Sequence, residues 1–151
     1  MNKPVLFCYD GSEGSKTALR AAADLIKPAD AVVLVAWTPA AVQLARAGSF
    51  LVDVPNEGEI DEHEAEAARG IAEEGAVAAR ARGYNASARV AQANESVART
   101  IDQIAQEIDA GLVVCGQRGR GMLGSALLGS VSHALAMHTK RPVLIAPAHP
   151  S

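Results

Sequence analysis

Five short apolar runs are spaced along the chain, and each predicts a β-strand. Residues 5–9 and 31–37 are apolar at consecutive positions, which is the pattern of a strand buried on both faces of a sheet. A weaker run and two further continuous runs lie nearer the C-terminus, at residues 86–91, 112–115 and 142–146. The chain is therefore expected to form five strands, most of them buried.

Between these runs, apolar residues recur at helical spacing. The first such segment follows Asp10-Gly11-Ser12-Glu13-Gly14-Ser15, which offers capping side chains, and ends at Pro28, because proline does not continue a helix. Residues 57–82 are rich in Ala and Glu and predict a long helix. Its alanine stripe would let it lie close to the sheet, although Gly70 and Gly75 weaken the helical propensity. The stripe consists of Ala65, Ala68, Ala72, Ala76 and Ala79.

Two more helices are predicted in the second half of the chain. Asn94 is expected to cap a helix that includes Val97 and Ile101, and Val131 and Leu135 mark the last helix. Residues 38–57 contain two prolines and a glycine and predict a long irregular segment. Such segments in compact domains often act as functional lids, and disorder is the alternative interpretation.

Strands that alternate with helices favour an α/β fold, with a parallel sheet covered by helices on both faces as a three-layer sandwich. Ligands in such folds bind beyond the carboxyl ends of the strands. Asp10, Trp37 and Gly116 each stand at or just after the end of a predicted strand. We expect these residues to converge on one crevice.

Size and charge narrow the range of functions. The chain has 151 residues, and residues 1–151 are expected to form a single domain. The segment 110–151 contains four Lys and Arg and no Asp or Glu, whereas residues 1–109 carry ten Lys and Arg against seventeen Asp and Glu. Four cations around a glycine-rich loop suit a small anion better than nucleic acid, which requires a wide basic face.

Several other features argue against alternative classes. Cys8 and Cys115 stand inside apolar runs, as expected for reduced, buried thiols. The histidines lack the spacing of metal ligands, so no metal site is predicted. We see neither a signal peptide nor an apolar stretch of about 20 residues, which predicts a cytoplasmic protein without a membrane anchor.

Three glycine motifs overlap after the fourth strand. Gly119 to Gly124 matches the dinucleotide pattern G-x-G-x-x-G, but no acid follows to hold a ribose hydroxyl. The same stretch begins like a P-loop, yet Ser125 stands where that motif needs lysine. The remaining pattern is Gly116-x2-Gly119-x9-Gly129-Ser130. A loop of this kind, before a helix and without carboxylates, is suited to phosphate.

In this third pattern the chain resembles the nucleotide-binding branch of the universal stress protein family, whose signature is G-x2-G-x9-G-[S/T]. The segments VLFCYDGSEGS and GSVSHALAMHTKRPVLIAP also look like the family's opening and closing segments, so the resemblance covers the whole chain. It implies a Rossmann-like sheet with the strand order 3-2-1-4-5. It further implies a homodimer, commonly joined through the last strands.

The resemblance also implies a binding site for ATP, with Mg²⁺ carried by the phosphates. Asp10 and the residues just before it would line the site, Trp37 would border the adenine, and Arg118 would face the ribose or phosphates. Asp10 could instead only cap a helix, Trp37 could be a core anchor, and Arg118 could be a solvated cation. The residues expected at the nucleotide are Cys8, Tyr9, Asp10, Trp37, Cys115, Gly116, Arg118, Gly119, Gly129, Ser130, Val131 and Ser132.

The pattern predicts binding more firmly than catalysis. No catalytic triad, reactive cysteine or pair of carboxylates can be identified near the loop, so no catalytic residues are predicted. The resemblance therefore implies an ATP-binding stress-response or regulatory protein that signals through a homodimer or a protein partner. Two alternatives stay open: a slow ATPase or related adenine-nucleotide hydrolase, and a dimerisation domain that works without a ligand.

Overall fold

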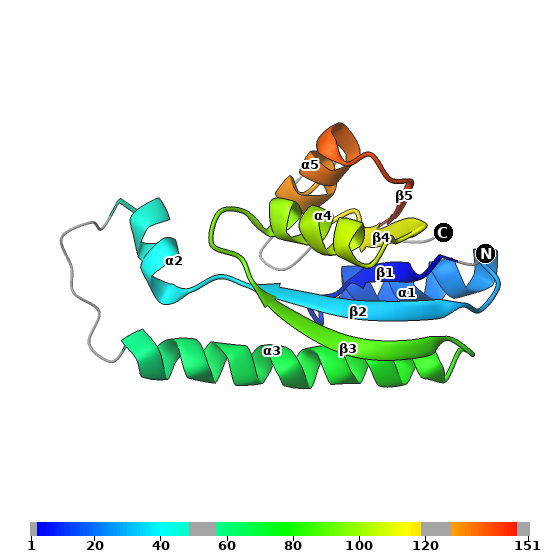
Figure 1. Cartoon of the computed structure of the whole chain (residues 1–151), viewed down its shortest axis with the longest axis horizontal. Coiled ribbons are helices and arrows are strands. Elements are labelled where there is room, and N and C mark those ends of the chain that lie inside the picture. Colours follow the sequence, from blue (N-terminus) through cyan, green and yellow to red (C-terminus); the bar gives the residue numbers. More distant parts are fainter. Residues whose placement is uncertain (1–2, 49–56, 119–127, 148–151) are drawn as a thin grey trace.

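We describe a computed structural model of the chain over residues 3–48, 57–118 and 128–147 (Figure 1). Within these residues five strands and five helices follow one another in the order β1 (Val5–Cys8), α1 (Glu13–Leu25), β2 (Asp30–Trp37), α2 (Ala40–Arg46), α3 (Glu57–Arg80), β3 (Asn85–Gln92), α4 (Val97–Glu107), β4 (Leu112–Gly116), α5 (Ser130–His138) and β5 (Val143–Ala146). The strands form one parallel sheet with the order β3-β2-β1-β4-β5. The predicted α/β fold and strand order are confirmed.

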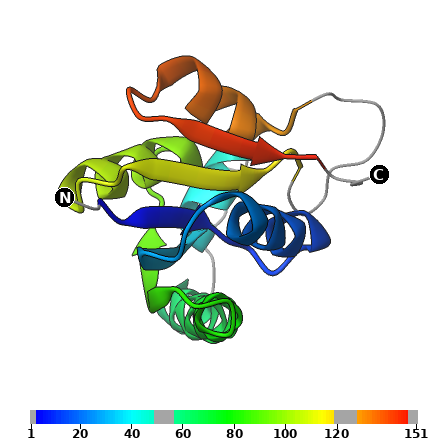
Figure 2. The ribbon, with the colours of Figure 1, turned by 90° about the vertical axis from the view of Figure 1, so that its right-hand side faces the viewer.

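Helices cover both faces of the sheet, as a parallel sheet requires. Helices α1 and α3 lie against one face, and α4 and α5 lie against the other (Figure 2). Side chains of β1 alternate between the two layers: Phe7 packs in the core under α1 and α3, whereas Leu6 packs in the core under α4 and α5. The sequence showed no polar alternation in this strand because both of its faces are buried.

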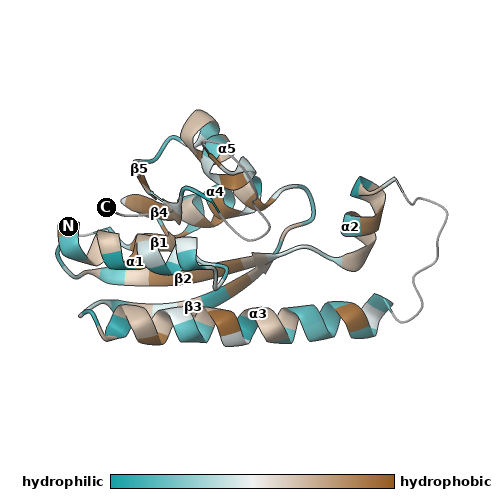
Figure 3. Ribbon diagram, turned by 180° about the vertical axis from the view of Figure 1, so that it is seen from behind, coloured by the Kyte–Doolittle hydropathy of each residue, from teal (hydrophilic) through white to brown (hydrophobic). Residues whose placement is uncertain are grey.

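Helix α3 lies close to the sheet because its inward face is made of small residues. Ala68, Ala72 and Ala76 are at most 3% exposed. A Cβ added to Gly75 would come within 2.7 Å of Val33 Cγ1, so this glycine is needed for the close approach and not merely tolerated. Figure 3 shows hydrophilic segments recurring along α3, while hydrophobic segments gather in β1 and β4.

Two local predictions were wrong. The segment predicted to be irregular contains α2, which starts after Pro39 and is built from good helix formers. The Asp61 carboxylate Oδ1 accepts a hydrogen bond from the Ala40 N–H at 2.9 Å and so satisfies one donor of its first turn. Residues 49–56, in the remainder of that segment, lie outside the described residues.

The second wrong prediction concerns the start of α4. The N-cap is Ser96, whose hydroxyl accepts a hydrogen bond from the Arg99 N–H at 3.1 Å. The Asn94 side-chain oxygen Oδ1 instead accepts from the Gln92 side-chain amide at 3.0 Å. Both residue types are good caps, so residue type alone could not decide between positions two residues apart.

Candidate functional site

A cleft of about 690 Å³ opens at the carboxyl ends of β1, β2 and β4. This volume lies within the usual range for small-molecule sites. All of the predicted site residues that the structure describes line it; Gly119 lies outside the described residues. These residues are Cys8, Tyr9, Asp10, Trp37, Cys115, Gly116, Arg118, Gly129, Ser130, Val131 and Ser132.

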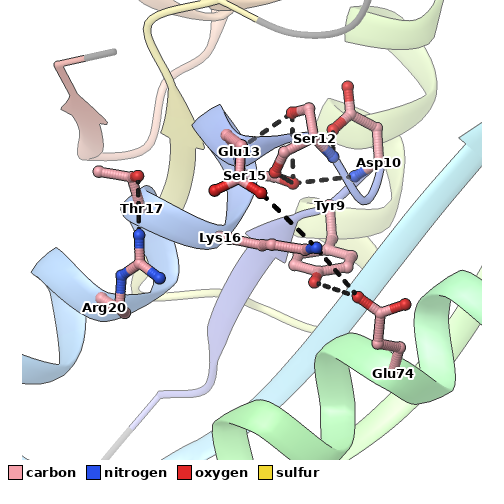
Figure 4. Close-up of polar contacts among 9 residues, drawn as sticks. All are labelled: Tyr9, Asp10, Ser12, Glu13, Ser15, Lys16, Thr17, Arg20 and Glu74. Atoms are coloured by element: carbon pink, nitrogen blue, oxygen red, sulfur yellow. Dashed lines mark hydrogen bonds and ion pairs between the residues drawn. The ribbon is translucent and has the colours of Figure 1, made fainter. Parts of the chain in front are cut away.

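Asp10 shapes the turn between β1 and α1. Its carboxylate Oδ1 accepts a hydrogen bond from the Ser12 N–H at 2.9 Å, and Ser12 in turn caps α1 by accepting from the Ser15 N–H at 3.2 Å (Figure 4). Gly11 allows the turn because its φ is +78°, in the left-handed region that favours glycine. Asp10 is thus not itself the N-cap of α1, and it stands on the wall of the cleft.

The Tyr9 side chain contacts helix α3. Its phenol hydroxyl donates to Glu74 Oε1 of α3 at 3.2 Å, and its ring lies against Gly75. Burial, followed by the neighbouring Glu74 carboxylate, raises the pKa of Tyr9 to about 12. The phenol therefore stays protonated at neutral pH and ties β1 to α3.

Two glycines bring the start of α1 against the loop after β4. A Cβ on Gly14 would lie 2.3 Å from the Arg118 carbonyl oxygen, and a Cβ on Gly116 would lie 2.8 Å from the Gly14 carbonyl oxygen. Position 116 therefore requires glycine, because any side chain there would clash with the backbone of Gly14. Sequence reasoning missed Gly14; the only signal was its place in a glycine- and serine-rich turn.

The same loop is fastened to the start of α5. The Gly129 N–H donates to the Gln117 carbonyl at 2.8 Å, and the Ser132 hydroxyl donates to that carbonyl at 2.9 Å. Ser132 is 2% exposed, so its hydroxyl serves to position the loop. Ser130 is exposed, and the N-cap of α5 is Gly129, which has no side chain to cap the first turn. This helix start can therefore offer backbone N–H groups to an anion.

Charged and aromatic side chains complete the cleft. Among the described residues that line it, Arg118 and Arg46 are cations, and Asp10 and Glu64 are carboxylates. Trp37 is partly buried and also packs against the core under α1 and α3. It is therefore both a core residue and a wall of the cleft.

Cys8 and Cys115 are free thiols at the ends of neighbouring strands. Burial is the main cause that raises the pKa of Cys8 well above its usual range, with smaller contributions from Cys115 and Asp10. Burial also raises the pKa of Cys115 to about 11. Both are protonated at neutral pH, and thiols are poor nucleophiles in that form.

Sequence reasoning missed the outer part of the cleft. Its walls there come from α2, from the half of α3 nearest its N-terminus, and from the inward face of α4. The sequence pattern places Val97 and Ile101 in a helix but does not indicate that they line a cleft. The residues missed as cleft lining include Gln43, Arg46, Glu64, Ile71, Val97 and Ile101.

The described residues contain neither a metal-binding cluster nor a membrane-spanning helix. No group of three or more His, Cys, Asp or Glu side chains within them could hold a metal ion. Likewise, none of their helices combines the length and the apolar character required to cross a bilayer.

Comparison with known proteins identifies relatives of the chain. The sequence model of the Universal stress protein family matches residues 1–147. No curated protein sequence is significantly similar to the chain.

Several solved structures share the fold. The hypothetical protein MJ0577 has a TM-score of 0.80 at 20% identity, covering 100% of this chain and 99% of its own. A universal stress protein in complex with cAMP has a TM-score of 0.61 at 23% identity, covering 98% of both chains. The universal stress protein from Archaeoglobus fulgidus in complex with dAMP has a TM-score of 0.60 at 20% identity, covering 96% of this chain and 97% of its own.

Proposed function

The chain belongs to the universal stress protein family, and on that premise we propose that its cleft binds an adenine nucleotide, ATP with Mg²⁺ carried by the phosphates, as a regulatory signal. The observation that carries this proposal is the meeting of three strand ends with the start of α5 in one cleft. The first turn of α5, the Arg118 cation and the Trp37 ring all border this cleft.

The proposed phosphate end lies where α5 begins. A phosphate there would accept hydrogen bonds from the N–H groups of the first turn and would be favoured by the helix dipole. Ser130 would add a hydroxyl donor, and Arg118 would add positive charge. Ser132 would act indirectly, since its hydroxyl already holds the Gln117 carbonyl.

The proposed base end lies toward Trp37. An adenine against this side chain would gain apolar burial and stacking. Two solved relatives with this fold are in complex with cAMP and dAMP, and both ligands are adenine nucleotides. These complexes support an adenine ligand, while the choice of a triphosphate depends on the glycine loop.

The chemistry of Asp10 suits a magnesium ion brought in by the phosphates. Mg²⁺ in nucleotide sites is commonly held by one or two carboxylates together with phosphate oxygens. Asp10 lines the cleft and its Oδ1 already accepts one backbone N–H, which fixes the carboxylate in the turn. When bound, the ion would neutralise part of the triphosphate charge.

We further propose that nucleotide occupancy is read through a homodimer or a protein partner. Strand β5 is at an edge of the sheet and pairs only with β4 among the described strands. A second copy could add its own edge strand there. In this proposal Gln117 connects the two sites, because its carbonyl accepts from the Gly129 N–H before α5 and its N–H donates to the Ala146 carbonyl of β5 at 2.7 Å.

The test is a calorimetric titration of the wild-type protein and the Gly129→Ala variant with Mg-ATP. An alanine Cβ at position 129 would sit at ordinary contact distances, the nearest being 3.4 Å from the Gln117 oxygen, so the fold should tolerate it. The added methyl would crowd the proposed phosphate position. We expect saturable binding by the wild type and at least about tenfold weaker binding by the variant, which corresponds to about 1.4 kcal/mol.

The matched control is Gly70→Ala, at a helical glycine with open space around it and outside the cleft. It should bind like the wild type. Absence of binding at millimolar nucleotide, or equal affinity in Gly129→Ala, would count against the proposal. Measuring ADP release in the same samples separates a binding protein from a hydrolase: steady turnover above roughly 1 s⁻¹ would favour the enzyme.

A further inference from the structure

The two cysteines stand side by side across the β1–β4 pair. The parallel register joins Leu6 to Val113 and Phe7 to Val114, so the next pair along the two strands is Cys8 and Cys115. Residues two apart on a strand share a face, and Leu6 and Val113 both belong to the core under α4 and α5. Both thiols therefore stand on that face, at the floor of the cleft.

Strand spacing makes this pair poorly suited to closing a disulfide. Neighbouring strands lie about 4.7–4.9 Å apart, and side chains stand roughly perpendicular to the sheet. The Cβ atoms of paired residues are therefore separated by about the same distance. A disulfide prefers a Cβ–Cβ distance of about 3.8 Å. The gap between two cysteines at paired positions is therefore wider than an unstrained disulfide prefers.

The gap matches a bridging metal ion. Metal–sulfur bonds in protein thiolate sites are about 2.3 Å long, so two bonds on opposite sides of one ion span up to about 4.6 Å. We propose that Cys8 and Cys115 form a two-sulfur site for a soft monovalent cation, of which the cuprous ion is the representative.

The surroundings favour two-coordinate binding. Zinc sites require four ligands, whereas the described residues offer no cluster of three or more His, Cys, Asp or Glu side chains. The side chains packed in the same core include Leu34, Ile101 and Leu135, which provide no donor atoms. A soft cation such as Cu(I) is selected by thiolates, and the proposed site supplies two of them.

Atoms and charge balance when the cation binds to the two cysteines. Two S–H bonds lose their protons to solvent, two S–Cu bonds form, and no electron is transferred. The bound unit carries one negative charge. The step requires only the cation, and it requires no nucleotide, so it stands independently of the proposed function.

The experiment is an anaerobic titration of the whole chain with Cu(I) against a chromophoric Cu(I) chelator, without nucleotide. We expect one equivalent to bind the wild type, and Cys8→Ser and Cys115→Ser each to weaken binding at least about 100-fold, because one sulfur cannot complete the site. Met137→Leu is the control, since Met137 is a soft ligand that is 65% exposed. That variant should bind like the wild type.

Three results would overturn the proposal: single cysteine variants within about threefold of the wild type, a stoichiometry of two equivalents in the wild type, or loss of binding in Met137→Leu. Cys8 is the less buried thiol, so Cys8→Ala provides a second variant if Cys115→Ser does not fold. In a parallel arm, wild-type protein is treated with a thiol oxidant and its mass is measured. Rapid, complete loss of two protons would mean that the pair forms a disulfide, which would also contradict the proposed geometry.

Discussion

Gly116 and Gly129 belong to one glycine pattern, but their surroundings differ. A Cβ on Gly116 would strike the backbone of Gly14, whereas a Cβ on Gly129 would meet the Gln117 oxygen at 3.4 Å. The first glycine is required for packing within the chain. The second would tolerate a methyl group at ordinary contact distances and lines the cleft, which is why its substitution serves as a test of ligand binding.

We expect Gly116→Ala to lower the free energy of unfolding by about 1–3 kcal/mol, the usual cost of forcing atoms into packed space. The clash involves backbone atoms, which cannot rotate away. Urea denaturation measures the change. Gly70→Ala provides the comparison, because that helical glycine has open space around it and alanine should raise stability there by about 0.5–1 kcal/mol. Equal stability of wild type and Gly116→Ala would show that the two backbone segments do not pack as described.

The residues at the cleft were predictable only in part. The positions of Asp10 and Trp37 at the cleft could be predicted, because both stand at or just after a strand end and ligands in such folds bind beyond the carboxyl ends of the strands. Gly14 and Gln43 could not, because their importance depends on contacts between segments far apart in the sequence: Gly14 touches Arg118, and Gln43 lies on a helix that faces the cleft.

At the scale of elements, the strong hydrophobic patterns predicted the strands reliably. The local sequence signals failed at two places, at α2 and at the start of α4. All five predicted strands are present, because continuous apolar runs between turn residues leave few alternatives. Helix α2 was missed since it is only seven residues long and has no buried residue, so it shows no periodic apolar face. Its position depends in part on Asp61, which comes from another helix.

The start of α4 offers a direct test of capping. We expect Ser96→Ala to lower the free energy of unfolding by about 1 kcal/mol, because the Arg99 N–H would lose its acceptor. Asn94→Ala is the matched control and should change stability by less than about 0.5 kcal/mol, since its exposed side chain caps no helix. Both are measured by urea denaturation. If Asn94→Ala proved the more costly change, the helix would begin where the sequence pattern had suggested.

At the scale of the whole molecule, alternation of strands and helices was sufficient for the fold class, and the resemblance to the universal stress proteins supplied the strand order. The structure adds how the pieces converge. Strand ends, the turn before α1 and the start of α5 meet because all the strands are parallel and point their carboxyl ends to one edge. The extension of the cleft over α2 and α3 is a tertiary feature that no local pattern encodes.

We propose that this cleft holds an adenine nucleotide. The most direct measurement is a crystal structure of the protein grown with Mg-ATP. We predict the triphosphate at the start of α5, beside Gly129 and Ser130, and the adenine next to Trp37. A nucleotide bound elsewhere on the chain, or a cleft without nucleotide at saturating Mg-ATP, would contradict the account.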